Sequence, residues 1–381
     1  MIYKQKEADL LVSLLACALG GDVPVLPEEV DWDNLYALST LQKVEAMTSV
    51  GLDGVEGVPQ DVRSRFAEAY KKEIAAYMVR RNEGIKILNA FEVNAVDCVP
   101  LKGWIMQDLY PNPAMRYMCD LDIMFKEEQS DDVQRVLVSL DYVPQELGGN
   151  PEVYFKKPIM NIEMHKRIYR DDTGHFDTTW ERVSLQKNCR HTYKMTWEDY
   201  YIYMIAHLYK HFIGGGTGVR YVCDTELFLR RFGETIDRDY VDNQLQKSGI
   251  LEFEQKLRAL CRVWFHGAPA DDALTAFSHK LLFCGVFGTP ERSEENQTKK
   301  TVQAMPGKTL RAKRMWYILS LLFPPLAVMR DVYPALRKAP FLLPVFWAVR
   351  GVQKLFTGKD TARHLLEGAG KVTDEDLWKN Y

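Results

Sequence analysis

The sequence predicts an α+β protein in which a small mixed sheet lies between two helical regions. Apolar residues recur at helical spacing through residues 1–91, and the same spacing returns from about residue 196. Between them lie short apolar runs separated by Pro, Gly and Asn, a pattern typical of strands and turns. We therefore expect four regions: an N-terminal helical region (1–91), an α/β domain (92–170), a helical domain (171–286), and a linker with a C-terminal segment (287–381).

Three helices are expected in the N-terminal region. The first carries leucines from Leu10 to Leu19 at helical spacing and stops at Gly20-Gly21. The second is expected from about Trp32 to Val50. The third, from about Val58 to Phe91, has an apolar stripe and a strongly charged opposite face.

The α/β domain is expected to begin with a short strand over residues 95–101. A helical turn follows, and then a strand over 118–125. A helix from about Ser130 to Leu140 comes next, with another strand beginning near Tyr142. Residues 153–165 form a β-hairpin around Pro158. These elements predict a mixed sheet.

Composition excludes several classes of protein. The 381 residues carry a net charge of −3, which gives no general attraction to nucleic acid. The seven cysteines are scattered without a CxxC pair, which indicates buried thiols in a reducing compartment. The charged residues among the first seven are unlike a signal peptide, and no apolar run has transmembrane length. A cytoplasmic location is expected, with peripheral contact to a membrane as an option.

Two acidic residues lie in a strand that is expected to be buried. Asp120 and Asp122 flank Leu121, so both carboxylates should point to one face, about 7 Å apart. Buried carboxylates repel each other and resist desolvation, and a bound cation relieves both costs. Oxygen ligands suit Mg²⁺, with Mn²⁺ as a second option. The alternative is a pair of solvated acids on a surface strand or turn.

A third carboxylate, Glu163, lies on the last strand of the hairpin, where Asn161 and His165 share its face. It could complete a metal site. The alternative is a salt bridge with a neighbour such as Lys166 or Arg167.

The order of these pieces resembles the nucleotidyltransferase superfamily that includes DNA polymerase beta and the aminoglycoside nucleotidyltransferases. Within it, the chain resembles the family described as uncharacterised nucleotidyltransferases, over most of its length. The matching pieces are Leu101-Lys102-Gly103, Tyr110, Arg116, Asp120-Leu121-Asp122, Ile162-Glu163-Met164-His165, His207 and His211, Gly216, Arg220, Asp224, and the Pro-rich stretch Pro334 to Arg350.

The resemblance implies transfer of a nucleoside monophosphate from an NTP, such as ATP, to an acceptor hydroxyl on a small molecule, a protein or RNA. Asp120 and Asp122 would hold the metals. Glu163 would complete the second metal site or act as a base on the acceptor. The cleft is expected between the sheet and the helices over 197–232.

Phosphate contacts are expected from Lys102, Gly103 and Arg116. The chain departs from the superfamily here, because most members carry Gly-Ser where this one has Lys102-Gly103. The serine hydroxyl is missing, and a lysine could replace its grip on phosphate. Two structural alternatives stand beside this interpretation: Lys102 as an exposed lysine at a strand end, and Arg116 paired with Asp120.

The resemblance also suggests that His207, Lys210 and His211 line the nucleotide pocket. His207 and His211 share a helix face, but the Glu of a HExxH zinc site and a third ligand are missing, so helix packing competes with this role. The glycines over 214–218 predict a helix–helix turn. Arg220 and Asp224 have the spacing of an ion pair.

The C-terminal segment is basic and aromatic. Residues 299–359 contain twelve Lys or Arg and a single acid, Asp331. The segment could pack as a helical cap on the acidic body, lie on an anionic membrane surface, or bind RNA. Two further functional classes therefore stay open. One is a non-catalytic scaffold that binds a membrane or partner, and the other is an RNA-directed, toxin-type nucleotidyltransferase.

Overall fold

The computed structural model describes residues 4–168, 173–214 and 217–285, together with parts of 302–349. The chain divides into two compact units, the first formed by Met1–Lys210 with Thr217–Phe287, and the second by His211–Gly216 with Gly288–Tyr381. The finer domain boundaries expected within the first unit remain predictions.

Four helices form the N-terminal part of the first unit: α1 (Gln5–Ala18), α2 (Trp32–Gln42), α3 (Glu45–Gly51) and α4 (Gln60–Val93). The expectation of one helix from Trp32 to Val50 was wrong. Lys43 adopts the left-handed conformation with φ 53°, which ends α2 before α3 begins. The side-chain amide of the buried Gln42 donates to the carbonyls of Leu281 and Leu282, which holds the end of α2 against α12 (Asp272–Cys284).

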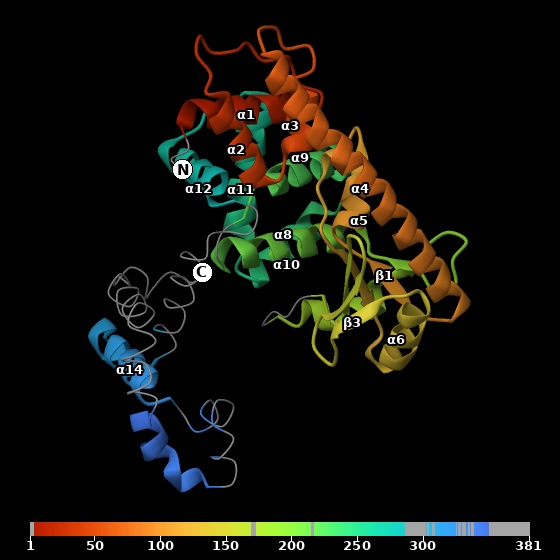
Figure 1. Cartoon of the computed structure of the whole chain (residues 1–381), viewed down its shortest axis with the longest axis vertical. Coiled ribbons are helices and arrows are strands. Elements are labelled where there is room, and N and C mark those ends of the chain that lie inside the picture. Colours follow the sequence, from red (N-terminus) through yellow and green to blue (C-terminus); the bar gives the residue numbers. More distant parts are fainter. Residues whose placement is uncertain are drawn as a thin grey trace. The chain divides into compact units, whose positions relative to one another are not determined.

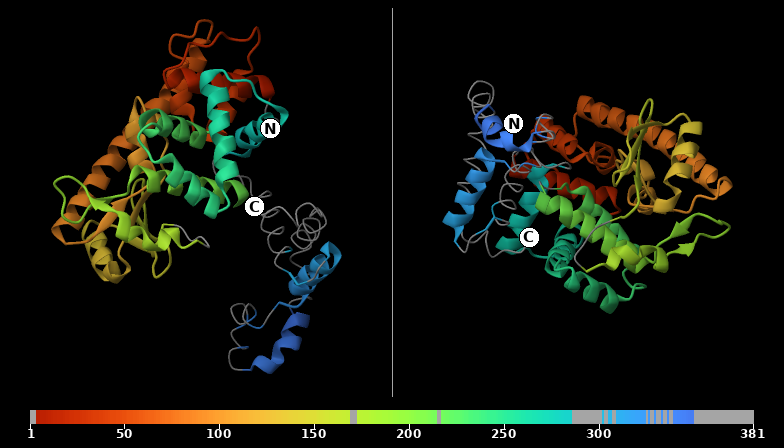
Figure 2. Two further views of the ribbon diagram at one scale, coloured as in Figure 1. Left: turned by 180° about the vertical axis from the view of Figure 1, so that it is seen from behind. Right: turned by 90° about the horizontal axis from the view of Figure 1, so that it is seen from below.

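Helix α4 connects the N-terminal helices to the sheet. It packs against α3 near one end and against α6 (Ser130–Ser139) near the other, and the sheet lies at its α6 end (Figures 1 and 2). Gly84 in the last third of α4 gives room to the ring of Trp104, which lies in the short helix α5 (Gly103–Met106). The guanidinium of Arg81 covers the same ring at 4.1 Å.

Replacing Gly84 with alanine is expected to destabilise the protein by about 1–2 kcal/mol. Alanine normally favours a helix over glycine, but a Cβ at this position would lie 2.3 Å from Cζ3 of Trp104. Urea unfolding of Gly84→Ala measures the change. The double variant Gly84→Ala/Trp104→Leu should recover stability, whereas a single variant as stable as the wild type would contradict this packing.

The sheet has the order β1-β2-β5-β4-β3. Its strands are β1 (Cys98–Pro100), β2 (Leu121–Phe125), β3 (Val143–Glu146), β4 (Glu152–Lys156) and β5 (Met160–His165). The pairing of β2 with β5 is parallel and the other pairings are antiparallel. The mixed sheet and the β4–β5 hairpin confirm the predicted α+β class.

One face of the sheet forms the core of the α/β part. Leu121, Ile123 and Phe125 alternate along β2 and are buried, as are Ile162 and Met164 on β5. They pack against apolar residues of α4 and α6: Ile87, Phe91, Val133, Val136 and Leu137. Because side chains alternate along a strand, the residues between them, including Asp122 and Glu163, are directed to the opposite face.

The remaining helices of the first unit are α7 (Thr179–Arg182), α8 (Trp197–Gly214, whose last turn is assigned to the second unit), α9 (Arg220–Phe232), α10 (Arg238–Lys247), α11 (Leu251–His266) and α12. Short 3-10 turns are η1 (Gln107–Leu109), η2 (Pro113–Met115), η3 (Glu127–Gln129) and η4 (His175–Thr178), and β6 (Ser184–Leu185) pairs with β7 (Tyr193–Lys194). All seven cysteines are free.

The described part of the second unit contains α14 (Leu310–Leu322) and the short turn η5 (Pro340–Leu342). Val302, Leu310 and Tyr317 form a small apolar cluster there. Much of the expected linker over 287–308 and of the basic segment lies outside the described residues. Within the described part of the chain, no helix combines the length and the apolar character needed to cross a membrane.

Candidate active site

The structure places Asp122 and Glu163 side by side. They are register partners on the parallel strands β2 and β5, and both are directed away from the apolar core. The side chain of Asp122 is 3% exposed, whereas that of Glu163 is 27% exposed. The pair therefore combines one enclosed carboxylate with one that solvent or a ligand can reach.

Asp120 is placed less deeply than the sequence suggested. Strand β2 begins at Leu121, so Asp120 precedes the strand and is only half-buried. Its Oδ1 accepts a hydrogen bond from the thiol of Cys119 at 2.7 Å. The ligand atoms of Asp122, Glu163 and His165 lie within 4.8 Å of one another, so among the described residues His165 joins the two acids as a candidate metal ligand.

Asp122 has two cationic or polar partners on one oxygen. Its Oδ1 lies 2.5 Å from Nζ of Lys102 and 2.7 Å from Nε2 of His165. The same nitrogen of His165 is 3.6 Å from Oε2 of Glu163. Lys102 is therefore no exposed strand-end lysine. The alternative partners of Glu163 are engaged elsewhere, since Lys166 pairs with Glu152 and Arg167 lies beside Glu127.

These contacts separate the proton affinities of the two acids. Burial opposes ionisation of Asp122, but the Lys102 ammonium and the His165 hydrogen bond outweigh it and hold its pKa below the usual value. Burial raises the pKa of Glu163 to about 7, and the carboxylates of Asp122 and Asp120 act in the same direction. Near neutral pH the centre therefore holds one ionised carboxylate beside one that is ready to gain or lose a proton.

The raised pKa of Glu163 makes a prediction about stability in metal-free buffer. An acid whose pKa is raised from 4.5 to about 7 by folding contributes stability below pH 4.5, and that contribution is lost as pH rises through about 7. Glu163→Gln should therefore melt at a higher temperature relative to the wild type at pH 8 than at pH 5. Melting curves in EDTA measure the difference. The exposed Glu146→Gln is the control, and an equal offset at both pH values would refute the assignment.

The backbone of Lys102 has an unusual conformation for a lysine. Its φ of 44° and ψ of −117° lie where glycine is favoured, and such a residue costs about 1–3 kcal/mol. Its carbonyl accepts from the Tyr200 hydroxyl at 2.9 Å and from the backbone N–H groups of Ile105 and Met106 at 3.2 and 3.0 Å. These hydrogen bonds hold the turn that aims the lysine at Asp122.

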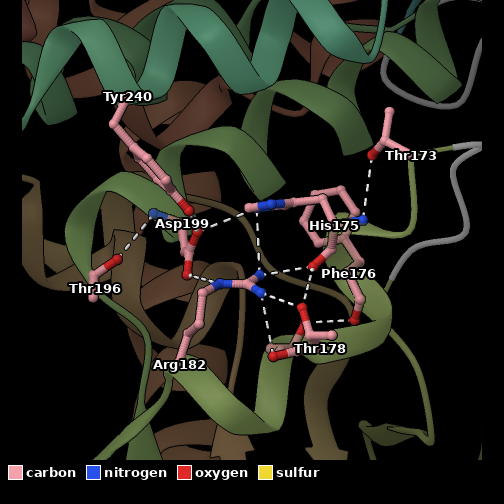
Figure 3. A network of polar contacts seen from close by, with 9 residues as sticks. Thr173, His175, Phe176, Thr178, Arg182, Thr196, Asp199 and Tyr240 are labelled. Carbon is pink, nitrogen blue, oxygen red and sulfur yellow. Dashed lines mark hydrogen bonds and ion pairs between the residues drawn. The ribbon is translucent and has the colours of Figure 1, made fainter.

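A polar network lies at the start of α8, next to Tyr200 in the sequence (Figure 3). The preceding residue, Asp199, accepts from Nε of Arg182 at 2.8 Å and from the Tyr240 hydroxyl at 3.0 Å, and it lies 3.1 Å from Nε2 of His175. Thr196 accepts from the Asp199 backbone N–H, as an N-terminal cap. The segment around η4, helix α10 and the start of α8 are thereby held together.

Arg116 packs against the turn at Gly103 and does not pair with the carboxylates of Asp120, Asp122 or Glu163. Its guanidinium makes two hydrogen bonds of 2.8 Å to Asp224, which also accepts from the hydroxyl of Tyr110. A Cβ on Gly103 would lie 2.8 Å from Nη1 of Arg116 and 2.6 Å from Sδ of Met118. Gly103 is therefore needed for close packing over Arg116, and a nucleotide contact by Arg116 remains a prediction.

Neither the alternative pair Arg116–Asp120 nor the expected pair Arg220–Asp224 forms. Arg116 pairs with Asp224 and not with Asp120, because α9 brings Asp224 against the turn after η2. Arg220 is not the partner of Asp224, since its Nη1 donates to the backbone carbonyl of Tyr117 at 2.7 Å.

The three residues expected to line the pocket lie along α8. His207 is half-buried, with its ring 5.9 Å from that of Tyr203. Lys210 and His211 are exposed. Their part in nucleotide binding remains a prediction. Tyr203 is fully buried, and its hydroxyl has no hydrogen-bond partner within the described residues.

His165 and Tyr200 are site residues whose roles the sequence did not reveal. The sequence placed His165 on the face of Glu163 at strand spacing, but it did not indicate the contact of His165 with Asp122. Tyr200 lies in an apolar stretch of α8 and gives no local signal, because its role depends on the turn at Lys102.

A mixed sheet with neighbouring carboxylates on its parallel strand pair, preceded by a Lys-Gly turn, is consistent with a nucleotidyltransferase fold. The model of a family described as uncharacterised nucleotidyltransferase matches residues 28–266, and the chain belongs to this family. The protein is therefore an enzyme of the phosphorus-group transferase class. No curated protein and no solved structure matched the chain.

Proposed function

We propose that the protein transfers a nucleoside monophosphate from an NTP, with ATP as the first candidate, to an acceptor hydroxyl in a reaction that depends on Mg²⁺. The observation that carries this proposal is the pairing of Asp122 with Glu163 on β2 and β5. Asp120, at the entry to β2, would join them.

The donor set fits a divalent cation. Two carboxylates and an imidazole offer ligand atoms within 4.8 Å of one another. Carboxylate oxygens suit Mg²⁺ and Mn²⁺, and the nearby imidazole of His165 favours Mn²⁺ as a substitute. When bound to Asp120, Asp122 and Glu163, the cation would neutralise charge on the triphosphate.

Where Glu163 is not itself a metal ligand, it is the group best suited to receive a proton from the acceptor. Its pKa of about 7 is near the operating pH, and its side chain is partly exposed. In the proposed step, the acceptor oxygen forms a bond to the α-phosphorus and its proton passes to the Glu163 carboxylate. The bond between the α-phosphorus and the bridging oxygen breaks, and pyrophosphate leaves with the electron pair.

The nucleotide would lie over the turn at Lys102 and Gly103. The Lys102 ammonium is already in the acidic centre, where it would meet phosphate oxygens as well as Asp122. His207, Lys210 and His211 are proposed as further nucleotide contacts, and Arg116 is proposed to take part in nucleotide binding indirectly. Arg116 would act through its support of Gly103.

An incubation assay tests the function. The protein is incubated with each of the four α-labelled NTPs, with Mg²⁺ or Mn²⁺, and with separate pools of RNA, protein and sugar acceptors. We expect pyrophosphate release together with label on one acceptor class, both lost in EDTA. If no pyrophosphate is released with any NTP and any acceptor pool, nucleotidyl transfer is contradicted. Labelled RNA would select the RNA-directed alternative.

The acceptor and the location are also proposals. The basic residues over 299–359 suit an anionic surface, either a membrane or RNA, and the free cysteines suit the cytoplasm. A purely non-catalytic scaffold would keep its binding function when Asp122 is replaced by asparagine.

A further inference from the structure

The side chain of Lys102 lies inside the acidic centre. Its Nζ is 2.5 Å from Oδ1 of Asp122, and the side chain is only 19% exposed. A protein cation is therefore already in contact with the most deeply buried carboxylate of the site.

The oxygen that Lys102 contacts has little capacity for another partner. A carboxylate oxygen has two lone pairs, and Oδ1 of Asp122 has both Nζ of Lys102 and Nε2 of His165 within 2.7 Å. A carboxylate that bridges two metal ions gives one oxygen to each. With Oδ1 occupied, Asp122 has one oxygen left for a metal.

The position of Lys102 is built into the fold. Its backbone has a conformation that glycine would adopt more easily, yet a lysine is present. Its carbonyl is held by the hydroxyl of Tyr200, a side chain that is itself 1% exposed. A strained backbone held by buried contacts indicates a defined role for the side chain it presents.

We propose that this site takes one divalent cation, and that the ammonium of Lys102 occupies the place of a second. The inference rests on the proposed nucleotidyl transfer and specifies its charge balance. Three carboxylates are balanced by one ammonium and one divalent cation. Lys102 then contacts Asp122 and the triphosphate together, which gives the lysine in the Lys-Gly turn a function that a Gly-Ser turn lacks.

Manganese titration followed by electron paramagnetic resonance tests the proposal without an activity assay. The probes are Mn²⁺ alone and Mn²⁺ with each of the four α,β-methylene NTPs. We expect the wild type and Lys102→Arg to bind one Mn²⁺ at the site. Lys102→Met and Lys102→Gly should bind two, with the spectral coupling of neighbouring ions. Lys102→Gly also relieves the strain of the positive φ, so it serves as the folded variant if Lys102→Met does not fold. Lys126→Met, which removes one of the partners of Asp97 next to the ends of β1 and β2, should bind one ion.

Two coupled ions in the wild type would overturn the proposal and leave the nucleotidyl-transfer function intact. One ion in both Lys102→Met and Lys102→Gly, with unchanged affinity, would also overturn it. A wild type that binds Mn²⁺ neither alone nor with any of the four analogues would instead contradict the metal-dependent function.

Discussion

Replacing Asp122 with asparagine is expected to reduce nucleotidyl transfer by at least about 10³-fold. The substitution keeps the shape of the side chain but removes the charge that Lys102 and His165 contact and that a divalent cation requires. Pyrophosphate release from the preferred NTP measures the loss, and circular dichroism shows whether the variant is folded.

The matched control is Asp131→Asn, which removes an exposed carboxylate from the first turn of α6. It should retain wild-type activity. A folded Asp122→Asn variant with the activity of this control would remove Asp122 from the catalytic site and favour a non-catalytic role for the fold.

The largest expected effect on stability comes from Asp224→Ala, which should destabilise the protein by about 3–5 kcal/mol. The side chains of Arg116 and Asp224 are 5% and 1% exposed, and they share two hydrogen bonds. Removing the carboxylate leaves the Arg116 guanidinium buried without a counter-charge, and it also leaves the Tyr110 hydroxyl without its acceptor. Urea unfolding measures the change in the free energy of unfolding.

Two controls separate burial from ion pairing as such. The double variant Arg116→Met/Asp224→Leu removes both charges and should recover a large part of the loss. Glu68→Ala breaks the exposed pair with Lys72, whose N–O distance is also 2.8 Å, and should change stability by no more than about 0.5 kcal/mol. A similarly small effect for Asp224→Ala would contradict a structural role for the buried pair.

The sequence predicted the features of the fold that depend on local pattern. Alternating apolar residues over 118–125 and 153–165 gave the central strands, and the parallel pairing of β2 with β5 then made neighbours of Asp122 and Glu163. The break between α2 and α3 was missed because Lys43 is not a residue that usually adopts positive φ, and the contacts of Gln42 with α12 are distant in sequence.

The partners of the charged residues could not be predicted in the same way. Arg116 lies four residues from Asp120 but 108 residues from Asp224, its partner in the structure. Which acid an arginine meets depends on the packing of α9 against the turn. Similarly, Lys102 points at Asp122 because of a backbone turn held by Tyr200, and neither contact has a periodic signal.

The most direct measurement of the central claim is anomalous diffraction from crystals grown with Mn²⁺ and the non-hydrolysable analogue of the preferred NTP. We expect a manganese peak within ligand distance of a carboxylate oxygen of Asp122, with the triphosphate of the analogue beside it over Lys102-Gly103. Manganese and triphosphate bound elsewhere, with Asp122 still paired only to Lys102 and His165, would contradict nucleotidyl transfer at this centre.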